Sequence, residues 1–408
     1  MKCRHCNTSL NLLFADLGSA PPSNAYLTAE NLHRPEKWFP LRVYACERCK
    51  LVQTEDFAER ETMFSDDYAY FSSFSTTWLA HAKSYVDEVI TRFRLGANSR
   101  VVEVAANDGY LLQYVQARGI PCLGIEPTAS TATAARDKGI DVVEDFFGCA
   151  LAKKLVDQGL QADLLVANNV LAHVPDINDF LGGFTLLLKA NGVVTFEFPH
   201  LMRLVAEHQF DTIYHEHYSY LSLIAVNTIF AVNGLTVFDV DELTTHGGSL
   251  RVYAQQTASG SNLPSERVEA MLNAERSAGL EDPAYYLGFQ DAASRVKNDF
   301  LYFLLNSHRL GKTVVGYGAA AKGNTLMNYA GIRPDLMAYV VDRNPAKQGK
   351  FMPGSRIPIV GEDILMAMKP DYIVILPWNI KNEVMQQLAY VKDWGGRFVT
   401  TVPHLDIV

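Results

Sequence analysis

Residues 101–112 read VVEVAANDGYLL, and this stretch decides the fold. Its first four residues predict a buried strand, and its last three begin a helix. Between them lie two small residues, Ala105 and Ala106, and the flexible Gly109, so a ligand can approach the backbone of this turn closely. A buried strand, a sharp turn and a helix in this order are typical of a parallel α/β sheet.

Strand and helix patterns alternate on both sides of this turn. A helical periodicity at 78–90 precedes it, and apolar runs follow at 123–126, 164–167 and 193–198. The alternation predicts a mostly parallel, doubly wound sheet. Two further runs, 236–240 and 249–254, with a Gly-Gly turn signal before the second, predict an antiparallel edge pair.

The C-terminal part predicts a second α/β unit. Residues 264–308 contain no strand-like run and read as one or two long helices. Short apolar runs then alternate again with helical patterns, at 313–316, 338–341, 372–376 and 398–402. We expect this unit to be Rossmann-like.

The composition of the chain narrows the classes of function. Its 408 residues are too many for one ordinary core, and 48% apolar with 20% charged residues is a globular composition. A formal net charge of -9 argues against a wide electrostatic grip on nucleic acid. No apolar run approaches the roughly 18 residues of a membrane span, and Met1-Lys2-Cys3 begins no signal peptide. We therefore expect a soluble, cytoplasmic protein without nucleic-acid or membrane partners.

Four of the six cysteines form two Cys-x-x-Cys pairs, Cys3 with Cys6 and Cys46 with Cys49. Each pair spans a tight turn that can aim two thiolates at one ion, and two such turns make a closed, structural zinc site. The gap of residues 7–45 exceeds that of common zinc ribbons, so an inserted loop or hairpin must fill it. Four incidental free cysteines are the alternative.

The turn at 105–109 favours S-adenosylmethionine over a dinucleotide. The next strand ends in Glu126, whose carboxylate can accept both hydrogens of a ribose diol. The glycine-rich pyrophosphate fingerprint is absent, and Asn107-Asp108 stands in its place. An acidic turn repels a diphosphate and suits a cofactor that carries an ammonium and a sulfonium. The candidate cofactor residues are Glu103, Ala105, Asn107, Asp108, Gly109, Glu126, Phe146, Asn168 and Asn169.

With these motifs the chain resembles the sugar C-methyltransferases that add a branch methyl to nucleotide-linked 4-keto deoxysugars. The resemblance covers nearly the whole length. It lies in the double Cys-x-x-Cys, the cofactor turn, and the segments DYAYFSS at 67–73, IYHEHYSYLS at 213–222 and GYGAAAKGN at 316–324. It implies three domains, with the sugar nucleotide bound between the middle and C-terminal ones, and methylation that we expect at C3.

The resemblance also implies roles for single residues. Asp108 and Glu126 would bind the cofactor and His217 would be the base. Tyr214, Glu216 and Tyr68 would shape the acceptor site, and the candidate substrate residues are His173, Tyr220, Gly318 and Lys322.

Carbon methylation next to a carbonyl needs a base that titrates near neutrality, and histidine supplies one. His215 and Tyr214 are alternative bases, and a helix whose histidines are satisfied by core hydrogen bonds is the alternative to a site. On a helix the adjacent Glu216 and His217 would not face each other, so Glu216 is expected to orient His215 or bind a sugar hydroxyl. The glycine-rich loop at 316–323 follows a strand, so its amides and Lys322 are expected to hold a phosphate.

We therefore expect a zinc-binding module at 1–70, a class-I methyltransferase domain at 71–260, and a helical linker with a C-terminal α/β domain at 261–408. Three other functions stay open at this point. They are methylation of another small-molecule acceptor, an NAD-dependent oxidoreductase, and a zinc-dependent binding module without activity.

Overall fold

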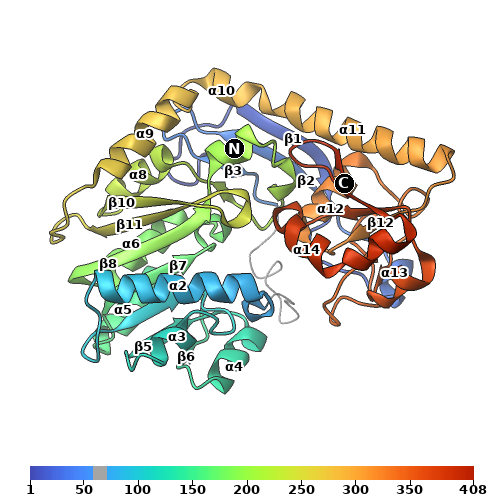
Figure 1. Cartoon of the computed structure of the whole chain (residues 1–408). Coiled ribbons are helices and arrows are strands. Elements are labelled where there is room, and N and C mark those ends of the chain that lie inside the picture. The colour runs from blue at the N-terminus through green and yellow to red at the C-terminus, as the bar shows by residue number, and fades with distance from the viewer. Residues whose placement is uncertain (58–70) are drawn as a thin grey trace.

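The computed structural model describes residues 1–57 and 71–408, and these residues form three sheets (Figure 1). The first sheet is antiparallel, in the order β1-β2-β3-β9. Its strands are β1 (Leu12–Ala20), β2 (Phe39–Ala45), β3 (Val52–Thr54) and β9 (Ser219–Tyr220). The hairpin of β1 and β2 fills the gap between the two cysteine pairs, as expected. The fourth strand comes from much later in the chain and ties this sheet to the middle of the protein.

The central sheet has seven strands in the order β10-β11-β8-β7-β4-β5-β6. Strands β4 to β8 are parallel, whereas β11 pairs antiparallel with β8 and β10 antiparallel with β11. This is the class-I methyltransferase arrangement, and the predicted doubly wound sheet with its antiparallel edge pair is confirmed. The strands are β4 (Val101–Val104), β5 (Cys122–Ile125), β6 (Val142–Val143), β7 (Ala162–Asn168), β8 (Leu188–Pro199), β10 (Leu235–Leu243) and β11 (Ser249–Gln256).

Helices connect the parallel strands of the central sheet, and side-chain caps begin several of them. The Asp176 carboxylate accepts the amides of residues 178 and 179 at the start of α6, and the Ser222 hydroxyl accepts the amide of residue 225 in α8. The helices are α2 (Thr76–Arg92), α3 (Leu112–Gln116), α4 (Ala129–Asp137), α5 (Cys149–Asp157), α6 (Ile177–Leu187), α7 (Leu201–Ala206) and α8 (Leu223–Val232).

The third sheet has the order β14-β13-β12-β15-β16-β17 and is parallel except for β17. When the six strands are numbered by their order in the chain, they lie in the order 3-2-1-4-5-6, which is that of Rossmann folds. Its strands are β12 (Val314–Tyr317), β13 (Val340–Val341), β14 (Ile359–Val360), β15 (Tyr372–Ile375), β16 (Arg397–Thr400) and β17 (Asp406–Ile407). The helices α12 (Ala321–Ala330), α13 (Asp363–Met368) and α14 (Lys381–Gln387) accompany them.

Three helices, α9 (Glu266–Ala278), α10 (Pro283–Leu287) and α11 (Phe289–Arg309), link the second and third sheets. The long α11 runs along one side of the molecule and contacts both β1 and α12 (Figure 1). At its start Phe289 stacks on Phe14 of β1, with ring centroids 4.4 Å apart. The first and third sheets thus share one hydrophobic core.

A buried carboxylate holds the segment that follows β8. The Glu275 carboxylate of α9 accepts a hydrogen bond from the His200 ring at 2.7 Å and from the backbone amides of Leu223 and Ile224 at 2.6 and 2.8 Å. It therefore fixes both ends of residues 200–223, which carry the Tyr-His-Glu-His run. In the described residues, no helix combines the length and the apolar character that a membrane crossing requires.

Candidate active site and metal centre

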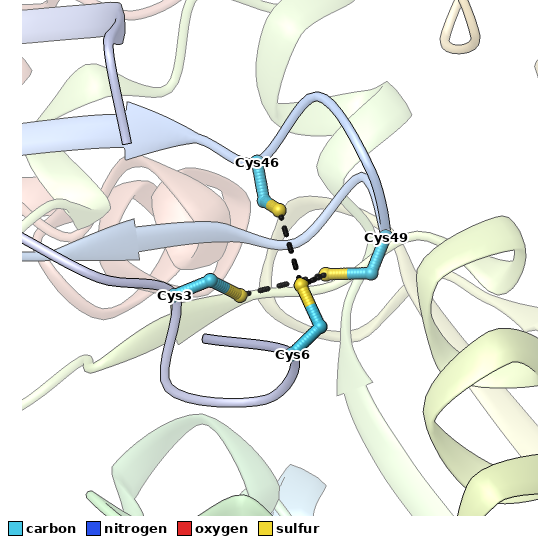
Figure 2. A group of neighbouring side chains, drawn as sticks. All are labelled: Cys3, Cys6, Cys46 and Cys49. Carbon is cyan, nitrogen blue, oxygen red and sulfur yellow. Dashed lines mark hydrogen bonds between the residues drawn. The ribbon is translucent and has the colours of Figure 1, made fainter. Parts of the chain in front are cut away.

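The four predicted cysteines meet at one point (Figure 2). Their sulfurs all lie within 4.8 Å of one another, with Cys3 to Cys49 and Cys6 to Cys46 both at 3.5 Å. A tetrahedron with metal–sulfur bonds of about 2.3 Å has edges of about 3.8 Å, so the set fits zinc. None of the four cysteines lines either of the two cavities described below, which is consistent with a structural ion.

The two cysteine turns have the same backbone geometry. The amide of Asn7 donates to the carbonyl of Cys3, and the amide of Lys50 donates to that of Cys46. Both donors have a left-handed φ, 57° and 61°. Gln53 donates its side-chain amide to the Cys3 sulfur at 3.3 Å. Hydrogen bonds of this kind orient a metal ligand and favour its thiolate form.

The turn after β4 is held in an unusual backbone conformation. Ala105 and Asn107 have φ values of 60° and 49°, which non-glycine residues adopt rarely and mostly where a site requires it. The Glu126 carboxylate accepts the amides of Asn107 at 2.9 Å and of Thr128 at 3.0 Å. Burial raises the pKa of Glu126, and the two amides oppose that effect. One carboxylate thus ties the ends of two neighbouring strands together.

A cavity of about 430 Å³ opens beside this turn, and we call it the inner cavity. Two buried amide oxygens at its wall, Oδ1 of Asn168 and of Asn169, have no hydrogen-bond partner within the described part of the chain. Such acceptors suit an ammonium or an amino group of a ligand. The predicted residues that line the cavity are Ala105, Asn107, Glu126, Phe146, Asn168, Asn169, His173, Tyr214, Glu216, His217 and Lys322.

Other predicted cofactor residues do not line the inner cavity. Glu103 is wholly buried in β4, where desolvation raises its pKa well above the usual value. The Asp108 carboxylate turns to the amide of Ser73 at 3.3 Å and to the ammonium of Lys138 at 3.4 Å. Gly109 packs closely against Ile140, because a Cβ at this position would lie 2.4 Å from a methyl group of that residue.

The candidate substrate residue Tyr220 also lies elsewhere. Tyr220 is buried in β9, where it pairs with Val52 and does not line either cavity. Tyr68 falls outside the described residues.

The run at 214–217 is a tight turn and not a helix, which differs from the geometry we considered. Its side chains therefore diverge. His215 contacts the carbonyls of Phe39 and Pro40 at 3.3 and 3.2 Å, so it holds β2 and does not line the inner cavity. The expectation that Glu216 orients His215 is wrong, because its carboxylate accepts both hydrogen bonds from Asn24. The alternative, that Glu216 binds a sugar hydroxyl, stays a prediction.

His217 is held as a neutral imidazole with one defined tautomer. Its Nδ1 lies 2.9 Å from the carbonyl oxygen of Thr212, which can only accept, so Nδ1 carries the proton and Nε2 the lone pair. Burial lowers the pKa of His217 well below its usual value. Its ring packs against Tyr214 at 3.9 Å and His173 at 4.6 Å between centroids. Burial also lowers the pKa of His173, to about 4.

Glu216 joins the inner cavity to a second, larger cleft. The side-chain amide of Asn24 donates to its two carboxylate oxygens at 3.0 and 2.7 Å. Burial raises the pKa of Glu216 to about 7, against the opposing effect of Asn24. Near neutral pH this carboxyl can therefore either donate or accept a proton.

The larger cleft, of about 1060 Å³, lies between the N-terminal module and the third sheet, and we call it the outer cleft. Asn24, Ser72, Glu216, Ala320 and Lys347 line both spaces, so the two adjoin. Four cationic side chains line the outer cleft, namely Arg34, Lys37, Arg343 and Lys347, beside the four acidic ones Glu36, Glu216, Asp342 and Glu383.

In the outer cleft, Asp342 repeats the contacts of Glu126. It ends the second strand of its sheet and accepts the amides of Ala319 at 2.7 Å and of Asn344 at 2.8 Å. Glu126 likewise accepts one hydrogen bond from the amide of Asn107, in the turn after the first strand, and one from the amide of Thr128, two residues further along the chain. The third sheet therefore presents a carboxylate where nucleotide-binding folds use one.

The loop after β12 is built differently from our expectation. The amides of Gly318, Ala319 and Ala320 already donate within the protein, to a carbonyl of β13, to Asp342 and to Gly318. They are not available to cradle a phosphate. Gly318 lines the outer cleft with φ at +85°, and a Cβ there would lie 2.5 Å from the ring of Pro377. Lys322 lines the inner cavity and not the outer cleft.

Sequence reasoning missed several residues of the site. His246 lines the inner cavity with its ring 5.2 Å from Trp78, and burial lowers its pKa to about 4. Its position beside a Gly-Gly turn signalled only a turn. Asn24 and Lys347 lie in loops without any motif, so no local pattern could have found them.

Comparison with known proteins places this geometry in a family. Residues 3–64 match a zinc-binding domain of methyltransferases, residues 78–240 a methyltransferase domain, and residues 244–403 the C-methyltransferase C-terminal domain. The C-methyltransferase NovU of Streptomyces niveus is 32% identical over 407 residues, which cover 100% of this chain and 96% of NovU.

Solved structures resemble part of the chain. Magnesium protoporphyrin IX methyltransferase from Synechocystis PCC 6803 with bound S-adenosylmethionine is 14% identical, with a TM-score of 0.36 over 50% of this chain and 100% of that one. A methyltransferase from Thermotoga maritima is 16% identical, with a TM-score of 0.37 over 48% of this chain and 99% of that one. The full-length match to NovU and the three domain matches carry the assignment. The chain belongs to the S-adenosylmethionine-dependent C-methyltransferases that have an N-terminal zinc-binding domain.

Proposed function

We propose that this C-methyltransferase adds a branch methyl to a nucleotide-linked 4-keto deoxysugar, at C3 of the ring. The observation that carries the proposal is the inner cavity, where the neutral His217, with its lone pair on Nε2, lies beside the cofactor turn. A carbon next to a carbonyl is acidic enough for such a base, whereas methylation of a neutral amine needs little more than positioning.

The walls of the inner cavity divide into a cofactor part and an acceptor part. We assign Glu126 to the ribose hydroxyls, Phe146 to the adenine face, and the free oxygens of Asn168 and Asn169 to polar hydrogens of the cofactor. Bound S-adenosylmethionine supplies an electrophilic methyl group on a sulfonium, which the nucleophilic carbon of the acceptor takes up. Asp108 acts on the turn through its contacts to Ser73 and Lys138.

The acceptor sugar is assigned to the side of the inner cavity that holds His173, Tyr214, Glu216 and His217. The nucleotide is assigned to the adjoining outer cleft, whose cationic side chains suit a diphosphate and whose Asp342 suits a nucleoside hydroxyl. A sugar nucleotide thus spans both spaces and passes the residues that line both. The outer cleft lies between the N-terminal module and the third sheet, and residues of the central domain and of the third sheet meet in the inner cavity.

His217 takes the proton from C3 at Nε2, because Thr212 holds the proton of Nδ1 in place. The electron pair of the C–H bond then forms the carbon–carbon double bond of an enolate, and the carbonyl electrons move to oxygen. The buried, neutral state of His217 keeps it ready to accept a proton at neutral pH, and the negative enolate stabilises the imidazolium that forms. Burial also keeps water from the carbanion.

Incubation with S-adenosylmethionine and a panel of 4-keto sugar nucleotides tests the proposal, with the mass of each product as the readout. We expect a gain of one methylene on a nucleotide-linked sugar. We also expect deuterium from solvent to enter at C3 when S-adenosylmethionine is left out. Methylation of a different class of acceptor, with every sugar nucleotide unchanged, would refute the sugar assignment and leave the methyltransferase assignment intact.

A further inference from the structure

Lys322 is a cation from the third sheet that reaches the cofactor-binding sheet. It is the second residue of α12, and it lines the inner cavity together with Ala320 and Ala321. It does not line the outer cleft, where the other cations gather. Its neighbours in the inner cavity include His217 and His246, and its positive charge lowers the pKa of both rings.

The ammonium of Lys322 contacts two neutral side chains, an amide and an aromatic ring. Its Nζ donates to Oδ1 of Asn379 at 2.8 Å and lies 4.5 Å from the ring centroid of Trp378. Within the described ranges, the ammonium forms no ion pair. The carboxylate whose negative charge acts on the pKa of Lys322 is that of Asp211. One oxygen of Asp211 accepts the Trp378 ring N–H at 2.8 Å, and the other is buried without a partner among the described residues.

A partly buried ammonium without a close counter-ion is costly to keep, because desolvation disfavours its charged form. Burial accordingly lowers the pKa of Lys322, and Asp211 opposes this effect. An apolar side chain of similar length would avoid that cost. The arrangement therefore favours an anionic group that arrives with the acceptor and completes the contacts of Lys322.

We propose that Lys322 is a catalytic residue that holds the oxygen of the enolate formed in the inner cavity. This inference rests on the proposed function and names one further residue for it. When His217 removes the proton, the C–H electrons form the carbon–carbon double bond and the carbonyl pair moves to oxygen. The ammonium of Lys322 donates a hydrogen bond to that oxygen, and the carbonyl returns when the carbon takes up the methyl group.

The diphosphate of the acceptor is the other anion that a lysine can bind. The position of Lys322 argues against it, because Arg343 and Lys347 line the outer cleft and Lys322 does not. Of the two spaces, Lys322 lines the inner cavity alone, together with the base, whereas Lys347 lines both. A donor placed where charge develops stabilises the transition state and contributes little to substrate binding.

Lys322→Met tests this role, with Lys347→Met as a matched variant that also removes a lysine from a cavity wall. For Lys322→Met we expect turnover to fall by about 10²–10³-fold, with the affinities for S-adenosylmethionine and for a free nucleoside diphosphate unchanged. Solvent deuterium exchange at C3 should fall in parallel, and the primary deuterium isotope effect should rise because proton removal becomes limiting. For Lys347→Met we expect weaker binding of the nucleoside diphosphate.

Thermal unfolding of Lys322→Met guards against a merely structural effect. We expect an unfolding temperature equal to or above that of the wild type, since methionine removes a desolvated charge. Turnover and exchange within fivefold of the wild type would overturn the inference, and so would loss of nucleoside diphosphate binding without loss of exchange. If the wild type itself methylates no sugar nucleotide, the proposed function fails, and this outcome is distinct from the other two.

Discussion

Glu126→Gln probes the cofactor site through a single atom. The two carboxylate oxygens of Glu126 accept the amides of Asn107 at 2.9 Å and Thr128 at 3.0 Å. Glutamine has one accepting oxygen, so in either orientation its amide nitrogen faces a backbone N–H. The variant therefore loses one contact of the turn together with the charged acceptor that we assign to the ribose hydroxyls.

The magnitude follows from the chemistry of these bonds. A hydrogen bond to a charged group contributes roughly 1.5–3 kcal/mol. The dissociation constant for S-adenosylmethionine should therefore rise by about tenfold to about 150-fold. Isothermal titration calorimetry on the purified chain measures this directly, and circular dichroism of the variant checks that it is folded.

The pH dependence of the same titration gives an independent check. Because burial raises the pKa of Glu126, its carboxylate takes up a proton at a higher pH than an exposed glutamate does. The neutral acid cannot accept at both oxygens. Affinity of the wild type should therefore decline as the pH falls through that raised pKa, whereas affinity of Glu126→Gln should stay flat over the same range.

Asp108→Asn is the matched control, since it also neutralises one acid of this region. Its carboxylate faces Ser73 and Lys138, so we expect a smaller loss of affinity than in Glu126→Gln. If a folded Glu126→Gln binds S-adenosylmethionine within threefold of the wild type, or if Asp108→Asn loses more, the assignment of Glu126 is refuted.

Metal analysis should find about one zinc per chain. The double variant Cys46→Ser with Cys49→Ser should lose the zinc and unfold at a lower temperature. Full zinc occupancy in that variant would contradict a four-thiolate site. His217→Asn should lower turnover by about 10²–10⁴-fold with cofactor affinity intact and without deuterium exchange at C3, whereas near-normal exchange would move the base to a neighbour. Glu216 has a pKa raised to about 7 by burial, above the roughly 4.3 of an unfolded glutamate. The folded state therefore holds this proton more tightly, and the carboxyl destabilises the fold by up to about 4 kcal/mol as the pH rises between those values. Glu216→Gln should remove that slope from the denaturant midpoint, and parallel curves for the two proteins would show that the pKa is not raised.

Local patterns were sufficient for the elements that depend on neighbours in sequence. The turn at 101–112 and the two Cys-x-x-Cys turns each bring their residues together within one element, so spacing alone predicts them. The alternation of apolar runs predicted the parallel sheets because the periodicity of side-chain burial is a local property. Glu126 was predictable for the same reason, as it ends the strand after the turn.

The directions of the side chains at 214–217 were not predictable. Whether the run forms a helix or a turn depends on partners far away in sequence, namely Asn24 for Glu216 and a carbonyl of β2 for His215. The same holds for Lys322, which lines the inner cavity and not the outer cleft, while the amides of residues 318–320 before it donate within the protein. The boundaries at 70 and 260 stay predictions, and strand β9 at 219–220 shows that the first sheet is not made from one stretch of chain.

The sequence by itself determined the zinc ligands, the cofactor turn and the two α/β sheets, because the spacing within each Cys-x-x-Cys turn and the burial periodicity of each strand and helix are local patterns. Only the tertiary structure decided which cavity each charged side chain enters. Asn24, His246, Lys322 and Lys347 come from different parts of the chain, and they surround one site only because the three sheets pack together. The burial that this packing produces sets the protonation of His217 and Glu216, and no sequence pattern encodes burial across domains.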